Sequence, residues 1–114
     1  MCIMPMDDYF RSLKDLKPKE PVKGISVSSA YLDDAMLTYM EFELGSVIPK
    51  HKHLHEQITL ILERGMDMAV GGAKKTVIKG NIVSIPSNVV HSAQILDEFT
   101  VAVDAWSPAR EDYK

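Results

Sequence analysis

Imidazole side chains dominate the chemistry that this sequence offers. Three of its four histidines fall within the run HKHLH at positions 51–55, and the fourth is His91. Imidazole nitrogen is a favourable ligand for zinc, nickel, iron and copper. Two such ligands held on one rigid strand lose little entropy when they bind a shared ion. The run therefore indicates a transition-metal site.

The positions of these residues predict which of them point the same way. Alternate side chains of a strand face the same side, so His51 and His53 can converge on one point. Gln57 has the same parity and can join them if no bulge intervenes. His55 shares this parity too, so parity alone does not exclude His55 as a ligand. His91 must be brought in by the fold, and the alternative is that the run is a plain polar strand face.

A second candidate group is the one charged residue of the apolar run Val101–Trp106. Ala102, Asp104 and Trp106 share a strand face. If that face lines the interior, Asp104 loses solvation, its pKa rises, and it can act as a general acid or base. The alternative is an aspartate at a strand end that pairs with Arg110 for purely structural reasons. The residues alone leave both interpretations open.

Short strands separated by turn residues must position these groups. From Gly24 onward, turn signals recur at intervals of roughly 8–12 residues, which is typical of an all-β barrel or sandwich. The adjacent Gly71 and Gly72 can supply the positive φ angles of a tight hairpin turn. Strands are expected at Ile25–Ala30, Met36–Leu44, Ile58–Leu62, Met66–Val70, Lys75–Ile78, Ile82–Ile85, His91–Ile95 and Phe99–Ala105.

The first 23 residues are expected to form an extension ahead of a β domain at residues 24–114. Large apolar or aromatic residues recur at helical spacing between positions 9 and 16. Asp7–Leu16 is therefore expected to be a short amphipathic helix that packs on the β domain or on a neighbouring subunit. A polar linker rich in lysine, Lys17–Lys23, would connect the two parts.

Composition narrows the class of protein. The chain has 114 residues, 46% of them hydrophobic, and a formal net charge of -3, which fits one globular domain. The charge is mild and mixed, which argues against nucleic-acid binding. No apolar stretch reaches the roughly 18 residues of a membrane span, and the N-terminus does not have the pattern of a signal peptide. Cys2 is the one cysteine, so we expect no disulfide scaffold and a cytoplasmic protein.

The spacing of glycine and proline residues around the histidines resembles the two sequence motifs of the cupin superfamily. The first motif is matched by Gly45-x5-His51-x-His53-x3-Gln57, with Gly65 following, and the second by Gly80-x5-Pro86-x-Asn88-x2-His91. The resemblance spans about residues 24–108. It implies an all-β, double-stranded β-helix (the cupin jelly-roll barrel), preceded by a short helix or extension. It also implies one divalent metal ion (Zn, Ni, Fe or Mn) on His51, His53, Gln57 and His91.

Departures from the motifs carry information about the chemistry. Gln57 stands where the superfamily has Glu, Asn88 stands for a glycine, and Ile95 stands for the terminal Asn. Asn88 is a mild change, because Asn tolerates left-handed backbone angles. With Gln57, no protein carboxylate offsets the charge of the metal, so an anionic ligand is favoured. Such a site also suits Lewis-acid chemistry.

A narrower resemblance concerns the run His-x-His-x-His-Glu-Gln and the C-terminal tail Ser-Pro-x-Arg-Glu-Asp-Tyr. Both are similar to small cupins of pectin and alginate degradation, which convert 4,5-unsaturated uronates into linear keto sugars. The resemblance implies that Asp104 transfers the proton and Arg110 holds the anionic substrate. Trp106 is a candidate for stacking on the sugar, although a buried strand-end tryptophan is the commoner case. A homodimer is expected from the same resemblance and from the need to cover exposed sheet edges.

Two other classes of function remain open from the sequence. One is another metal-dependent cupin enzyme, such as a dioxygenase or an isomerase. The other is a non-catalytic cupin that binds a ligand or acts as a sensor. Cupins host many unrelated functions, so the fold alone does not choose among these alternatives.

Overall fold

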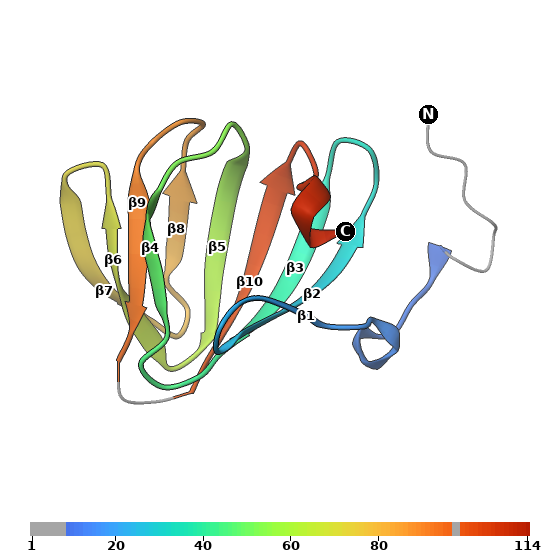
Figure 1. Ribbon diagram of the computed structural model, residues 1–114, viewed down its shortest axis with the longest axis horizontal. Coiled ribbons are helices and arrows are strands. Elements are labelled where there is room, and N and C mark those ends of the chain that lie inside the picture. Colours follow the sequence, from blue (N-terminus) through green and yellow to red (C-terminus); the bar gives the residue numbers. More distant parts are fainter. Residues whose placement is uncertain (1–8, 97–98) are drawn as a thin grey trace.

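The computed structural model describes residues 9–96 and 99–114 and shows two antiparallel sheets that face each other (Figure 1). Six strands form one sheet in the order β1-β2-β3-β10-β5-β8, and four form the other in the order β4-β9-β6-β7. The first sheet consists of β1 (Lys19–Val22), β2 (Ile25–Tyr31), β3 (Met36–Phe42), β10 (Thr100–Ser107), β5 (Glu56–Glu63) and β8 (Ile82–Ile85). The second consists of β4 (Val47–His51), β9 (His91–Ile95), β6 (Gly65–Val70) and β7 (Ala73–Ile78). The predicted all-β jelly roll is confirmed.

Alternation of apolar and polar side chains places the core between the sheets. In β5, Gln57, Thr59 and Ile61 are buried, whereas Ile58 and Leu60 between them face outward. The inward faces of the other strands contribute the rest of the core, which is mainly Ile25, Val27, Met40, Phe42, Met66, Met68, Ile85, Ala93, Ile95 and Ala102. Polar residues on these inward faces are therefore buried beside an apolar core.

Two turns use the left-handed backbone region as the sequence predicts. Gly71 has φ 59° in the hairpin between β6 and β7, and Asn88 has φ 64° in the turn before β9. Asn88 thus occupies a conformation that glycine usually supplies, which its short polar side chain tolerates. That turn delivers the chain to His91.

The expected strands agree with the observed ones to within two residues at each end. Two further strands were not expected. Val47–His51 forms β4, and Lys19–Val22, expected to be linker, forms β1 on the edge beside β2. Both segments contain a proline, which made a strand assignment from the sequence less favourable. Proline is compatible with an edge strand but argues against a central one.

The expected helix over Asp7–Leu16 is wrong for the part that can be compared, since residues 7 and 8 lie outside the described residues. Residues 9–16 contain the 3-10 helix η2 (Leu13–Asp15), and Tyr9, Phe10 and Leu13 are exposed. Figure 1 shows this segment extending away from the sheets. A helix this short is not stable without a surface to pack against. Within the described part of the chain, no helix has the length and apolar character needed to cross a membrane.

Candidate metal centre and its cavity

Three histidines converge at one end of the four-stranded sheet. His51 is the last residue of β4 and His91 the first of β9, and the register pairs them directly across the two strands. His53 lies in the connection from β4 to β5. One ligand nitrogen from each of the three rings lies within 4.8 Å of the others. The His51 and His91 rings are 4.2 Å apart, centre to centre.

The convergence has a different cause from the one predicted. His51 and His53 do not alternate along one strand, because β4 ends at His51 and the chain then crosses from the four-stranded sheet to the six-stranded one. Gln57 lies on β5, in that second sheet. The parity argument therefore does not explain why His51 and His53 lie together, and it did not distinguish them from His55. His55 stays outside the cluster, and its backbone carbonyl contacts His53 Nδ1 at 2.9 Å.

Backbone carbonyls fix how each imidazole presents its nitrogens. His51 Nδ1 lies 2.9 Å from the Pro49 carbonyl, and His91 Nδ1 lies 2.9 Å from the Val89 carbonyl. A carbonyl oxygen can only accept, so Nδ1 of each neutral ring donates and Nε2 keeps its lone pair. The same holds for His53, whose buried Nε2 has no partner among the described residues. All three rings thus offer Nε2 as a ligand atom.

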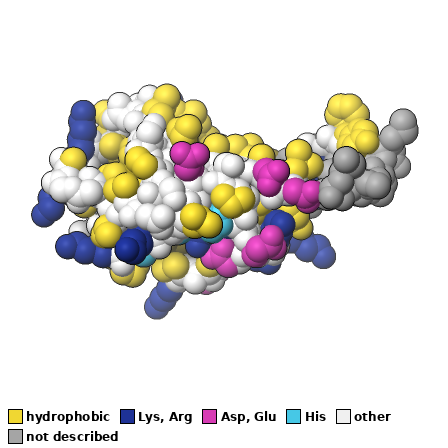
Figure 2. Space-filling model, turned by 90° about the horizontal axis from the view of Figure 1, so that it is seen from above, with side chains coloured by type: hydrophobic (Ala, Val, Ile, Leu, Met, Phe, Trp, Pro, Cys, Tyr) yellow, Lys and Arg dark blue, Asp and Glu magenta, His cyan; other side chains and the backbone are white. Residues whose placement is uncertain are grey.

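Burial keeps two of these rings neutral. Desolvation lowers the pKa of His53 and His91, and the positive charge of Arg110 and the neighbouring imidazoles adds to the effect. His51 and His53 are half-buried, and Figure 2 shows histidine atoms at the molecular surface. The backbone N–H of Asn88 donates to the His53 carbonyl at 2.8 Å, which ties the His53 connection to the turn before His91. Backbone contacts therefore hold the three rings in their relative positions.

A buried side-chain network faces the histidines from the six-stranded sheet. Gln57 Nε2 donates to Thr59 Oγ1 at 3.0 Å and to Asp104 Oδ2 at 3.3 Å. The register places Asp104 beside Thr59 on the neighbouring strand. Each of the three residues is at most 8% exposed. Two buried oxygens, Gln57 Oε1 and Asp104 Oδ1, have no partner among the described residues.

Ala102, Asp104 and Trp106 share a strand face as expected, and the structure shows that this face is buried. Desolvation raises the pKa of Asp104 to about 7, although a hydrogen bond with Thr59 and the charge of Arg110 oppose the increase. The purely structural alternative predicted a pair between Asp104 and Arg110. Arg110 instead donates through Nε and Nη2 to Asp112, at 3.0 and 2.7 Å.

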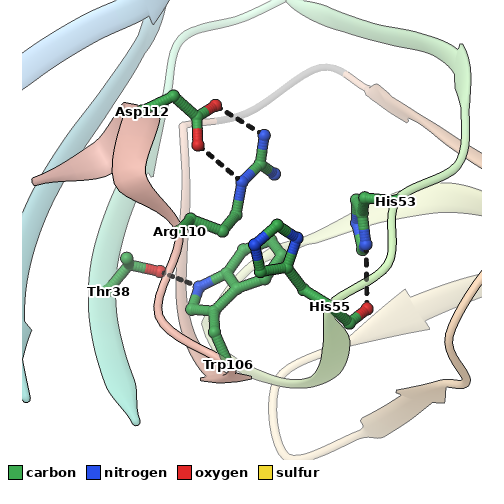
Figure 3. Close-up of polar contacts among 6 residues, drawn as sticks. All are labelled: Thr38, His53, His55, Trp106, Arg110 and Asp112. Carbon is green, nitrogen blue, oxygen red and sulfur yellow. Dashed lines mark hydrogen bonds and ion pairs between the residues drawn. The ribbon is translucent and has the colours of Figure 1, made fainter. Parts of the chain in front are cut away.

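Arg110 contacts two aromatic rings near the C-terminus, and the planes of these rings are tilted by 79° to each other. Its guanidinium carbon lies 4.9 Å from the centre of the Trp106 ring and 4.1 Å from that of Tyr113. Trp106 is 5% exposed, and its Nε1 donates to Thr38 Oγ1 at 2.9 Å (Figure 3). The short 3-10 helix η3 (Glu111–Tyr113) holds Tyr113 in place.

Most of these groups line one cavity. Its polar lining residues include His51, Gln57, Thr59, His91, Asp104 and Arg110. Trp106 and Tyr113 also line it, and its apolar lining residues include Ile25, Met40, Phe42, Met66 and Met68. A cavity with a few convergent polar groups on an otherwise apolar wall is the usual form of a small-molecule site.

The donor set fits a divalent transition metal. Three imidazole Nε2 atoms are ligands that such ions favour, and a buried amide oxygen without a partner, Gln57 Oε1, is available from the opposite sheet. The hydrogen bonds from Gln57 Nε2 to Thr59 and Asp104 fix which amide atom is free. Outer partners of this kind commonly orient metal ligands in proteins.

Two residues of the site went unrecognised in the sequence. Thr59 follows Gln57 by two positions on the same strand, so strand alternation could have placed it beside Gln57. Asp112 was part of the recognised tail, but its pairing with Arg110 depends on the η3 turn, which short-range patterns do not reveal.

The fold and the histidine cluster together indicate the structural class of this protein. Two facing antiparallel sheets with a three-histidine cluster at one end describe the fold of the small cupins, and this chain has that fold. It resembles the KdgF proteins within that class. No family model matches the chain.

Three known proteins support these statements. The pectin degradation protein KdgF of Dickeya dadantii (strain 3937) is 29% identical over 82 residues, covering 71% of this chain and 74% of that protein. The structure of KdgF from Halomonas sp. superposes with a TM-score of 0.80 at 25% identity, over 87% of this chain and 92% of that one. An RmlC-like cupin from Shewanella frigidimarina NCIMB 400 gives a TM-score of 0.87 at 23% identity, over 93% and 96% of the two chains.

Proposed function

We propose that this cupin binds one divalent transition metal ion and catalyses the opening of a 4,5-unsaturated uronate to its linear keto form. The observation that carries the proposal is that one cavity is lined by His51 and His91 of the three-histidine cluster, by Gln57, by the buried acid Asp104 and by the cation Arg110. The likeness to a pectin degradation protein supports a substrate from the same chemistry. The bound metal would supply Lewis-acid polarisation of the substrate oxygens.

Each polar group has a task in such a reaction. His51, His53, His91 and Gln57 would hold the ion, and Arg110 would bind the uronate carboxylate, since guanidinium forms charge-assisted hydrogen bonds with carboxylates. Ring opening breaks the bond between C1 and the ring oxygen while the C1 hydroxyl loses its proton. This leaves a C1 aldehyde and an enolate at C5, and addition of that proton to C4 converts the enolate into the C5 ketone.

No proton, electron or water is consumed overall, so one acid–base group suffices for both transfers. Asp104 is suited to this task, because its pKa of about 7 allows it both to accept and to donate near neutral pH. Its Oδ1 has no partner among the described residues. That oxygen is therefore available to a ligand in the cavity.

The test is loss of the ultraviolet absorbance of a 4,5-unsaturated uronate mixed with metal-loaded protein. A rate well above that of a protein-free sample is expected, and chelation of the metal should return it to the spontaneous rate. A metal-loaded sample that gives no acceleration would refute the proposed reaction. Tight binding of the uronate without turnover would instead identify a binding or sensor cupin.

We also propose that the outer face of the six-stranded sheet joins two copies of the chain. The register aligns Leu37 with Ala105 and Ile58 in one row and Leu60 with Ile82 in the next. Leu37, Ile58, Leu60 and Ile82 are between 37% and 65% exposed. A contiguous apolar face of this kind commonly marks a protein interface, and a closed dimer uses one such face from each copy.

Light scattering of the wild type is expected to give the mass of a dimer, and Leu60→Lys should shift it toward the monomer. Leu44→Lys is the matched control, because Leu44 is also exposed but lies in the turn after β3, off the sheet face. A monomeric wild type, or a dimer that Leu60→Lys leaves intact, would refute this interface.

A further inference from the structure

Arg110 is held unusually firmly for a cation that faces a cavity. Its side chain is 15% exposed and contacts both the Trp106 and the Tyr113 ring, whose planes are tilted by 79° to each other. Contacts with ring faces attract the guanidinium but do not select the direction of its individual N–H groups. A further contact is needed to fix which N–H groups point toward the cavity.

Asp112 supplies that contact from outside the cavity. Its two carboxylate oxygens accept from Nε and Nη2 of Arg110, at 3.0 and 2.7 Å (Figure 3). The Asp112 side chain is 58% exposed and stands outside the cavity wall formed by the described residues, whereas Arg110 is part of that wall. A guanidinium has five N–H donors in a rigid fork, so two engaged donors leave the others available.

We propose that Asp112 is a positioning residue that orients the Arg110 guanidinium so that its remaining N–H groups face the cavity and bind a carboxylate ligand. The proposal rests on the carboxylate-binding role proposed above for Arg110. It adds a residue that never touches the ligand but sets how well carboxylates bind. Uncharged sugars of the same size would gain nothing from Asp112.

Asp112 could instead compete with the ligand for the guanidinium, and the two roles predict opposite signs. Removing a competitor tightens the binding of an external carboxylate. Removing any negative charge near an anion site also tightens binding, through the general field. A positioning residue is distinguished by the reverse result, in which loss of its negative charge weakens the binding of an anion.

The pair is intact over the working pH range. Although burial opposes it, hydrogen bonding with Arg110 and the charge of that guanidinium lower the pKa of Asp112. The carboxylate therefore stays ionised near neutral pH. Asp112→Asn keeps the shape of the side chain, removes the charge, and leaves an amide that can accept through only one oxygen.

The experiment is calorimetric titration of the metal-loaded full chain with D-galacturonate, a stable uronate. Asp112→Asn is expected to weaken galacturonate binding about three- to tenfold, the size associated with losing one charge-assisted contact. Asp112→Glu, which keeps a carboxylate, should recover most of the affinity. Metal content and thermal midpoint are measured for every variant, so that a folding defect is recognised.

Glu111→Gln is the matched control. Glu111 is adjacent to Asp112 and pairs with Lys114, so this variant removes the same charge without touching Arg110. It should bind galacturonate as well as the wild type or slightly better. If Asp112→Asn binds as tightly as Glu111→Gln, or more tightly than the wild type, the positioning role is wrong.

Arg110→Gln separates this inference from the proposed function. If Arg110→Gln leaves galacturonate binding unchanged, the carboxylate-binding role of Arg110 fails, and the role of Asp112 fails with it. If Arg110→Gln weakens binding while Asp112→Asn does not, only the positioning role fails. Weaker binding in both variants, with recovery in Asp112→Glu, supports both.

Discussion

The two walls of the cavity hold their functional groups in different ways. On the wall of the four-stranded sheet and its connections, each histidine is oriented by a backbone carbonyl that contacts its Nδ1. On the wall of the six-stranded sheet, Gln57, Thr59 and Asp104 are oriented by one another's side chains. A backbone partner does not change when a neighbour is mutated, whereas a side-chain partner does.

This difference separates two properties of the site. The histidine wall presents lone pairs whose direction depends on the fold alone, which suits the capture of an ion. The opposite wall keeps an acid with a raised pKa in a network where each member depends on the others. Substitutions on the first wall should therefore change metal occupancy, and those on the second should change proton transfer and pH dependence.

The largest expected effect is on the histidine wall. His51→Ala combined with His53→Ala removes two of the three imidazole ligands and should lower metal affinity more than 100-fold, beyond the roughly 10–100-fold typical of losing an outer partner. Metal content after dialysis measures it. His55→Ala is the control, because His55 belongs to the same run but orients His53 through its backbone carbonyl, which the substitution keeps. Undiminished occupancy in the double variant would refute the ligand assignment.

The second-largest expected effect is the loss of turnover when the acid on the wall of the six-stranded sheet is removed. Asp104→Asn keeps the size of the side chain but removes the acid, so turnover of the unsaturated uronate should fall about 10²–10⁴-fold. Metal occupancy should remain, since the three imidazoles keep their carbonyl partners. Asp67→Asn is the matched control, because Asp67 is an exposed acid on β6, in the other sheet. Full activity in Asp104→Asn would show that another group moves the proton.

A smaller effect concerns the stability of the metal-free protein. The pKa of Asp104 is about 7 in the folded protein against 3.8 for an ordinary carboxyl. The folded state therefore binds more protons between these values, and its stability falls as pH rises through about 7. Asp104→Asn has no carboxyl to titrate, so its stability does not show this decrease. The difference in free energy of unfolding, variant minus wild type, should therefore rise by a few kcal/mol between about pH 4 and about pH 8.

Urea unfolding of both proteins with chelator present measures the difference at each pH. Comparing the two proteins cancels the titration of groups that they share. A constant difference across the range would mean that the carboxyl of Asp104 is not desolvated in solution.

The strands and the grouping of site residues were largely predictable from the sequence, because alternation and turn residues are local signals. Asp104 is an example, since the alternation of the strand placed it on one face with Ala102 and Trp106, although the structure was needed to show that this face is buried. The strand β4 was not predicted, because its proline and lysine are not typical of a buried strand, although both are compatible with an edge strand. The cause of the histidine convergence was also missed, since it lies in the crossing between two sheets.

The contacts that orient the groups required the structure. Pairing of Thr59 with Gln57 and Asp104 depends on the register between β5 and β10, which no single strand encodes. The pairing of Arg110 with Asp112 instead of Asp104 depends on the turn that forms η3. The Asp7–Leu16 helix failed for the opposite reason, because a helical spacing of apolar residues does not supply a surface to cover them.

The smallest expected effect tests how far the side-chain network of the second wall extends. Trp106 Nε1 donates to Thr38 Oγ1, and both residues are buried (Figure 3). Trp106→Phe leaves that hydroxyl without its donor and reduces packing, so it should lower the free energy of unfolding by about 1–3 kcal/mol. Thr38→Val should cost a similar amount. Urea unfolding should show that the double variant is less destabilised than the sum of the two, since each single change breaks the same bond. Strict additivity would mean that this hydrogen bond contributes nothing, and that Trp106 supports Arg110 through packing alone.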